Sequence, residues 1–174
     1  MDALDVEVSI AECEQALQAL LQFARDNAGT LEAHAAEKGI FKRLLPMGVA
    51  AMKRSFAQRG TGDVGPAVTR ADGVLLPREQ TLRGRDSCSL FGTCAVARTC
   101  YRTPGEPGIC PLDAQVNLPE RCSSSFLQEW MTLFEVEHPF KESAHWFEQL
   151  FDLDIAERVL MEVAKEAPAD DAGF

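Results

Sequence analysis

The chain has 174 residues of which 46% are apolar, enough to bury a core in one domain or two small ones, so wholesale disorder is excluded. A net charge of −10 at pH 7 argues against a uniformly basic nucleic-acid binder, and no run approaches the roughly 18 apolar residues that a membrane span needs. The acidic first residues lack the basic and apolar parts of a secretory signal, so we expect a cytoplasmic protein without a membrane partner.

Residues 1–59 are predicted to form an N-terminal helical segment. Apolar residues recur at helical spacing between residues 6 and 27, and a short helix over 31–38 follows. A third helix is expected over 40–58, kinked by Pro46. Two interpretations remain open: the three helices complete one core, or exposed apolar stripes on them pack against another chain. The first stripe consists of Ile10, Cys13, Leu17, Leu20, Leu21 and Ala24.

Residues 66–113 are predicted to form a small antiparallel β-sheet after the glycine-rich segment 59–65. Extended structure is favoured over 74–76, 87–91 and 93–101, and a strong turn signal over 103–108 closes the sheet. Cys88, Cys94 and Cys100 recur every six residues, an even step that places them on one face of a strand. Because a cytoplasm is reducing and no closely spaced cysteine pair suits zinc, we expect all six cysteines to be thiols.

Residues 118–167 are predicted to form a C-terminal helical bundle, followed by a frayed tail over 168–174. One helix is expected across the stripe from Phe126 to Phe134, and Pro139 can begin the next. Asp154 is expected to cap the last helix. The short link 152–154 makes the last two helices a pair that resembles a helix-turn-helix. The fold class is therefore α+β.

Charge is distributed unevenly along the chain. Residues 1–52 have four Lys/Arg against eight Asp/Glu, residues 53–102 nine against four, and residues 103–174 four against fifteen. The basic middle stretch can neutralise DNA phosphates, or it can pair with the acidic flanks. The last helix carries a net negative charge, so the arginines of the sheet are the better candidates for DNA contact. These hypothetical DNA-binding residues are Arg78, Arg83, Arg85, Arg98 and Arg102.

No catalytic constellation is evident in the sequence. His34, His138 and His145 are scattered, and no Gly-x-Ser-x-Gly elbow or phosphate-cradling Gly-Lys-Ser/Thr loop occurs. The carboxylates of the C-terminal helices lie opposite the apolar stripes, as on a solvated face. We therefore expect no catalytic residue, metal site or cofactor in this chain.

A set of short motifs in the middle of the chain carries a family resemblance. They are Leu90-Phe91-Gly92, Arg98 with Tyr101-Arg102, Pro111-Leu112-Asp113 and Asn117-Leu118-Pro119. With the helices that follow, they resemble the N-terminal region of bacterial insertion-sequence transposases of the ISKra family, over residues 30–167. The resemblance implies a transposase whose Asp/Asp/Glu triad binds divalent metal and transfers DNA strands. That triad lies in a later domain, so we expect a truncated chain that is inactive alone.

Several small residues stand where the resemblance leads us to expect Tyr or Phe: Ser87, Cys88, Cys94, Cys110, Ser123 and Ser125. This pattern suggests a decayed copy of a mobile element. The leading hypothesis is a non-catalytic part of a transposase that contributes DNA binding through residues 53–102, or self-assembly, to DNA transposition. The alternatives are a stand-alone DNA-binding regulator of the element, and a protein–protein module that inhibits a full-length transposase.

Overall fold

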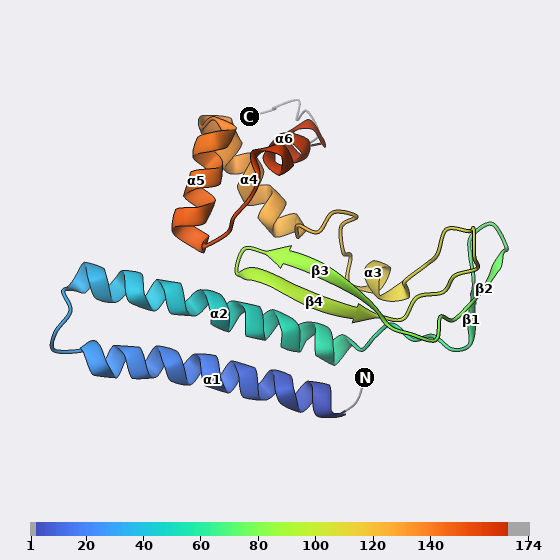
Figure 1. Cartoon of the computed structure of the whole chain (residues 1–174), viewed down its shortest axis with the longest axis horizontal. Coiled ribbons are helices and arrows are strands. Elements are labelled where there is room, and N and C mark those ends of the chain that lie inside the picture. Colours follow the sequence, from blue (N-terminus) through green and yellow to red (C-terminus); the bar gives the residue numbers. More distant parts are fainter. Residues whose placement is uncertain (1–2, 167–174) are drawn as a thin grey trace, which may run out of the picture.

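The computed structural model describes residues 3–166, with side chains described from residue 10 onward, so Ala167 and the predicted tail over 168–174 lie outside the described residues. Two long helices come first, then two β-hairpins, then four helices (Figure 1). This order confirms the α+β class. The elements are α1 (Ala3–Asn27), α2 (Ala33–Arg59), β1 (Ala67–Thr69), β2 (Leu75–Pro77), β3 (Arg83–Ser89), β4 (Gly92–Arg98), α3 (Pro111–Gln115), α4 (Ser125–Glu137), α5 (Phe140–Phe151) and α6 (Glu157–Glu166).

The N-terminal segment is a hairpin of two helices, so the expectation of three is wrong. Helix α2 continues through Gly39 and contains Pro46. A side chain at Gly39 would collide with the ring of Phe23, so the glycine serves the packing of α1 on α2 rather than a break between helices. Arg43 also covers that ring, with its guanidinium carbon 3.7 Å from the ring centroid. A three-helix core is therefore excluded.

The middle of the chain forms two separate two-stranded antiparallel sheets, β1–β2 and β3–β4, where a single sheet was predicted. In the β3–β4 hairpin Ser87 is opposite Cys94, and Cys88 is opposite Thr93. Cys88 and Cys94 therefore point to opposite faces, and the expectation that they share a face with Cys100 is wrong. The six-residue spacing fails because the chain reverses between the two cysteines.

A disulfide joins Cys100 to Cys110, which corrects the expectation of six thiols. The turn over 103–108 brings them together: the Tyr101 N–H donates to the Ile109 carbonyl at 2.8 Å, and the Ile109 N–H donates back at 2.9 Å. This pairing leaves the two cysteine Cα atoms 4.2 Å apart. Cys13, Cys88, Cys94 and Cys122 are free thiols.

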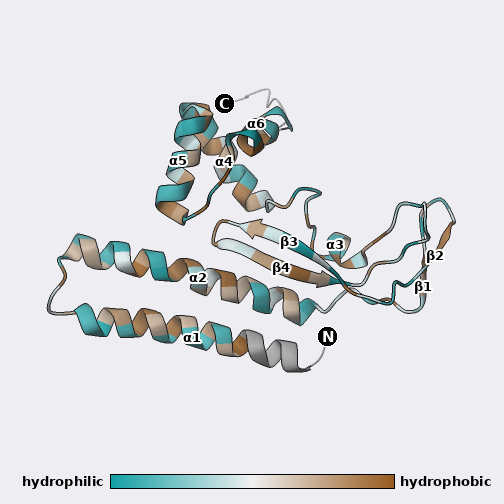
Figure 2. Ribbon diagram, in the orientation of Figure 1, coloured by the Kyte–Doolittle hydropathy of each residue, from teal (hydrophilic) through white to brown (hydrophobic). Residues whose placement is uncertain are grey.

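The main core lies between the C-terminal helices, where their apolar faces meet (Figure 2). Each helix contributes two buried residues: Leu127 and Met131 from α4, Phe147 and Phe151 from α5, and Leu160 and Val163 from α6. Leu45 of α2 and Leu90 of the β3–β4 turn join this cluster and connect the bundle to the rest of the fold. Within residues 3–166, no helix is long and apolar enough to cross a bilayer.

The ends of the C-terminal helices agree only in part with the sequence prediction. Pro139 immediately precedes α5, as expected for the start of that helix. Asp154 does not cap α6, because that helix begins at Glu157 and the Ala156 carbonyl accepts its first backbone bonds. The link between α5 and α6 is therefore longer than the predicted 152–154.

Glu135 of α4 has two buried carboxylate oxygens without a hydrogen-bond partner among residues 3–166. Burial raises the pKa of Glu135 from 4.5 to about 7. Below pH 4.5 this carboxyl is protonated in both the folded and the unfolded chain, so its burial costs little. As the pH rises through about 7 the buried group must ionise, and the folded state loses stability. We expect Glu135→Gln to raise the free energy of unfolding by about 1–2 kcal/mol at pH 8, after allowing for partial exposure, and by much less at pH 5.

Urea denaturation at the two pH values measures this difference. Glu129→Gln, an exposed carboxylate on the same helix, is the matched control and should change little at either pH. An equal gain for Glu135→Gln at both pH values would show that the carboxylate's charge is not the cause.

Candidate nucleic-acid interface

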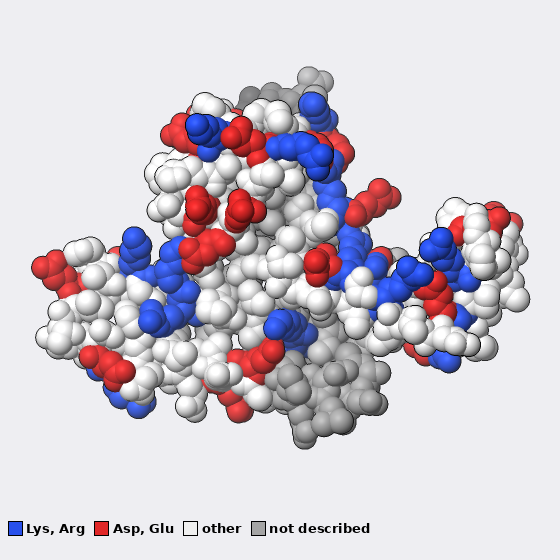
Figure 3. All heavy atoms as spheres, viewed as in Figure 1, with Lys and Arg blue, Asp and Glu red and all other residues white. Residues whose placement is uncertain are grey.

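The five predicted arginines all lie on or beside the two β-hairpins. Arg83 and Arg98 are opposite each other across β3–β4, and Arg85 is two residues further along β3. Arg78 follows β2 and pairs with Tyr101, which places it beside Arg102. Figure 3 shows Lys and Arg side chains in an interrupted band from the C-terminal helices toward the β1–β2 end of the molecule. The structure therefore gathers these residues in one region.

Arg85 and Arg98 converge on Asp113, and we call these three residues the Asp113 cluster. An Arg98 Nη1–H donates to Asp113 Oδ2, and Arg85 Nη1 lies 3.6 Å from the same oxygen. Arg85 Nη2 also donates to the carbonyls of Pro119 and Arg121, the latter at 2.6 Å. The arginine side chains are only 17% and 13% exposed. The cluster therefore ties the β3–β4 hairpin to the segment that contains α3. Its two guanidinium groups share one carboxylate and are mostly buried, so they are poorly placed to contact a phosphate.

Arg78, Arg83 and Arg102, the outer arginines, are exposed. Arg78 pairs with Asp63 and Arg83 with Glu79, and the two arginine side chains are 48% and 51% exposed. Arg102 has no ion pair among residues 3–166. Exposed pairs contribute about 0–1 kcal/mol to stability, so a phosphate can replace the carboxylates at little cost. The outer arginines are thus the available cations of the predicted five.

The carboxylates of these outer pairs are held in their charged forms. A hydrogen bond from the Gly65 backbone N–H lowers the pKa of Asp63, with Tyr101 and Arg78 adding to that effect. The hydrogen bond from Arg83 lowers the pKa of Glu79. At neutral pH both pairs are therefore fully ionised, and a competing anion meets charged guanidinium groups.

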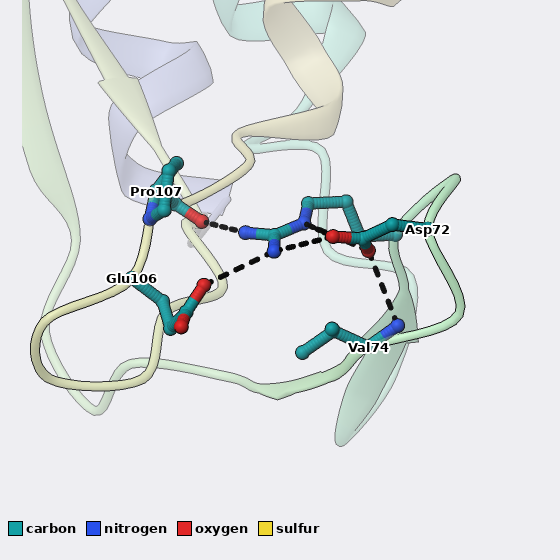
Figure 4. A network of polar contacts seen from close by, with 5 residues as sticks. Asp72, Val74, Glu106 and Pro107 are labelled. Atoms are coloured by element: carbon teal, nitrogen blue, oxygen red, sulfur yellow. Dashed lines mark hydrogen bonds and ion pairs between the residues drawn. The ribbon is translucent and has the colours of Figure 1, made fainter.

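Arg70, which the sequence analysis did not single out, fixes the β1–β2 hairpin to the loop over 103–108 (Figure 4). Its guanidinium donates to Asp72 at 2.6 Å, to Glu106 at 3.1 Å and to the Pro107 carbonyl at 2.9 Å. The hydrogen bond from Arg70 lowers the pKa of Asp72 to about 2. This network anchors the hairpin whose end carries Arg78.

The motif residues that carry the family resemblance have structural roles here. Tyr101 is fully buried, and its hydroxyl accepts the Val64 N–H at 2.8 Å. The same hydroxyl lies within donating distance of two acceptors, Asp63 Oδ1 at 3.1 Å and the Gly65 carbonyl at 3.0 Å. Leu112 is also fully buried, and Arg98 and Asp113 form the cluster described above. The motifs therefore hold together the joint between the hairpins and α3.

Two acidic side chains of helix α6 pair with Arg121 of the segment before α4. Arg121 donates to Glu162 at 2.9 Å and pairs with Glu166. A base-reading helix normally offers Arg, Lys, Asn or Gln to the base edges, whereas most of the charged side chains of α6 are glutamates. The geometry thus favours the hairpin arginines over α6 as candidates for DNA contact.

The three histidines contact other residues than the five arginines: His34 is next to Glu32, His138 is near Glu142, and the His145 ring is tilted against that of Trp146. In the part of the chain that the structure describes, no group of three or more His, Cys, Asp or Glu side chains is arranged to hold a metal ion. Comparisons with known protein families, curated proteins and solved structures find no match for this chain.

Proposed function

We propose that the chain is a non-catalytic, DNA-associated assembly module of an insertion-sequence transposition system, as its resemblance to ISKra-family transposases suggests. The observation that supports DNA association best is the division of the five arginines. Arg85 and Arg98 are mostly buried and share Asp113, whereas Arg78, Arg83 and Arg102 remain exposed on or beside the hairpins. Three such cations can contact the phosphates of a duplex, which positions a protein on DNA without reading its sequence.

The assembly part of the proposal rests on the N-terminal hairpin. Helix α1 packs along α2, yet its apolar residues Leu17 and Leu21 are 45% and 50% exposed. On α2, Phe41 and Leu44 are 40% and 38% exposed. Exposed apolar residues on neighbouring helices are typical of a surface that contacts another protein chain. A second copy or a full-length transposase would suit this surface.

Titration of a short mixed-sequence DNA duplex at several salt concentrations tests the DNA-binding part. We expect affinity to fall linearly with salt on logarithmic axes, and the triple variant Arg78→Gln/Arg83→Gln/Arg102→Gln to flatten that slope by about 3. Sedimentation velocity on the same samples reports self-association as a mass that rises with protein concentration.

The matched control is the triple variant Arg25→Gln/Lys141→Gln/Arg158→Gln, which replaces three exposed cations on helices away from the hairpins. It has the same net charge as the triple variant of the outer arginines. It should keep most of the wild-type slope. Equal loss in both triple variants would mean that net charge alone governs binding, and would contradict the assignment to the outer arginines.

A further inference from the structure

A pocket of about 500 Å³ is lined by residues from the C-terminal end of α2, strand β3, the segment from α3 to α4 and the start of α4. Although the chain has a net charge of −10, the residues that line this pocket include one arginine and no acidic side chain. The polar lining residues are Ser55, Arg59, Ser87, Gln115, Asn117, Ser124 and Ser125. The pocket is therefore rich in hydrogen-bond donors.

Ser87 provides the strongest indication of a ligand. The residue is only 3% exposed and lines the pocket, yet its hydroxyl has no hydrogen-bond partner among residues 3–166. On the same strand, by contrast, the Ser89 hydroxyl donates to the Gly92 carbonyl at 2.9 Å. The hydroxyl is not fully enclosed by protein, so it opens to the pocket and is free to donate to an acceptor there.

The N-terminus of α4 supplies further donors at the same pocket. Ser124 caps the helix by accepting the Leu127 N–H at 3.1 Å. The backbone N–H groups of Ser125 and Phe126 have no acceptor within the described residues. Unpaired N–H groups and the helix dipole make such an end favourable for an anion.

Arg59 adds a full positive charge to the rim. It lies in the last turn of α2, is exposed, and makes no ion pair within residues 3–166. The nearby carboxylate of Asp113 does not compete, because Arg85 and Arg98 hold it in the Asp113 cluster. A guanidinium paired with an anionic oxygen makes a strong, charge-assisted hydrogen bond.

We propose that this pocket binds a phosphate group through Arg59, the Ser87 hydroxyl and the free N–H groups at the start of α4. Four observations meet there: a hydroxyl without a partner in the described chain, two unpaired N–H groups at the start of α4, an arginine without an ion pair, and the absence of lining acids. The inference deepens the proposed function, under which the group is a backbone phosphate of DNA. A free phosphate ion would use the same donors.

Titration of the isotope-labelled chain with inorganic phosphate, at constant ionic strength against chloride, tests the pocket by amide chemical shifts in NMR. We expect saturable shifts at Ser87, Ser125 and Phe126. Arg59→Gln should weaken binding at least about tenfold, as expected for losing a charge-assisted hydrogen bond. Ser87→Ala should weaken it several-fold, and it should keep the fold because it breaks no hydrogen bond within the chain.

Arg25→Gln is the matched control, because Arg25 is an exposed arginine in the last turn of α1, just as Arg59 is in the last turn of α2. It should bind phosphate as the wild type does. Absence of saturable shifts, or equal weakening by Arg25→Gln and Arg59→Gln, would overturn the proposal.

A DNA titration of the Arg59→Gln variant distinguishes the source of the phosphate and separates this inference from the proposed function. If the chain binds phosphate but no DNA, the phosphate site stands and its ligand is a free phosphate ion. The same result would reject the proposed DNA-binding function. Conversely, DNA binding with no effect of Arg59→Gln on either ligand would reject the pocket and leave the function standing. Loss of both ligands in Arg59→Gln would support a DNA backbone phosphate.

Discussion

Replacing Asp113 with alanine should lower the free energy of unfolding by about 2–3 kcal/mol, because the change leaves two mostly buried guanidinium groups without a carboxylate. Removing one partner from a fully buried ion pair costs about 3–5 kcal/mol, and the residual exposure of this cluster reduces that range. Asp113→Asn should fall between alanine and the wild type, since the amide oxygen still accepts a hydrogen bond from Arg98 but carries no charge.

Urea denaturation of the variants measures this loss. Asp152→Ala is the control, because Asp152 forms a more exposed ion pair with Lys42. The side chains of Lys42 and Asp152 are 26% and 65% exposed, and we expect this substitution to cost less than about 1 kcal/mol. If Asp113→Ala were as stable as Asp152→Ala, the cluster would not be the joint between the β3–β4 hairpin and α3.

Loss of the Cys100–Cys110 disulfide should lower the free energy of unfolding by about 3 kcal/mol, since the bond closes a loop with a sequence separation of 10. The effect arises mainly because the reduced unfolded chain gains conformational freedom. Cys100 is 3% exposed and directly precedes the fully buried Tyr101, so we also expect reduction to loosen the turn that these residues close.

Denaturation with and without reductant, on the wild type and on Cys100→Ser/Cys110→Ser, gives this energy. The double variant should lose its sensitivity to reductant, whereas Cys122→Ser, which changes an exposed free thiol, should keep it. Thiol titration of the unreduced, unfolded wild type should give four thiols, and a count of six would contradict the disulfide.

Local sequence signals predicted most of the helices and turns. The apolar stripe of α4, Pro139 before α5 and the turn over 103–108 all act through neighbours in the sequence, and each was predicted correctly. The failures involve contacts across the chain. Residues 31–38 and 40–58 were expected to form separate helices, yet Gly39 between them lies inside α2. The Phe23 ring of α1 packs against this glycine, and tertiary packing overrides the weak local preference.

The candidate interface was only partly predictable. Composition identified a basic stretch, but it treated Arg83 and Arg98 as equivalent, although one is exposed and the other is nearly buried against Asp113. Which arginine is buried against Asp113 depends on where the chain brings α3, and no local pattern encodes that. The phosphate pocket was missed for the same reason, because its residues come from separate segments that meet only in the fold.

The most direct measurement is to incubate the purified chain with duplex DNA at low salt, with and without magnesium, and to analyse both the complexes and the DNA strands. We expect a protein–DNA complex that dissociates as salt rises, with every strand keeping its original length when magnesium is present. Failure to form a complex at any salt concentration, or magnesium-dependent nicking or joining of strands, would contradict a DNA-associated module without catalysis.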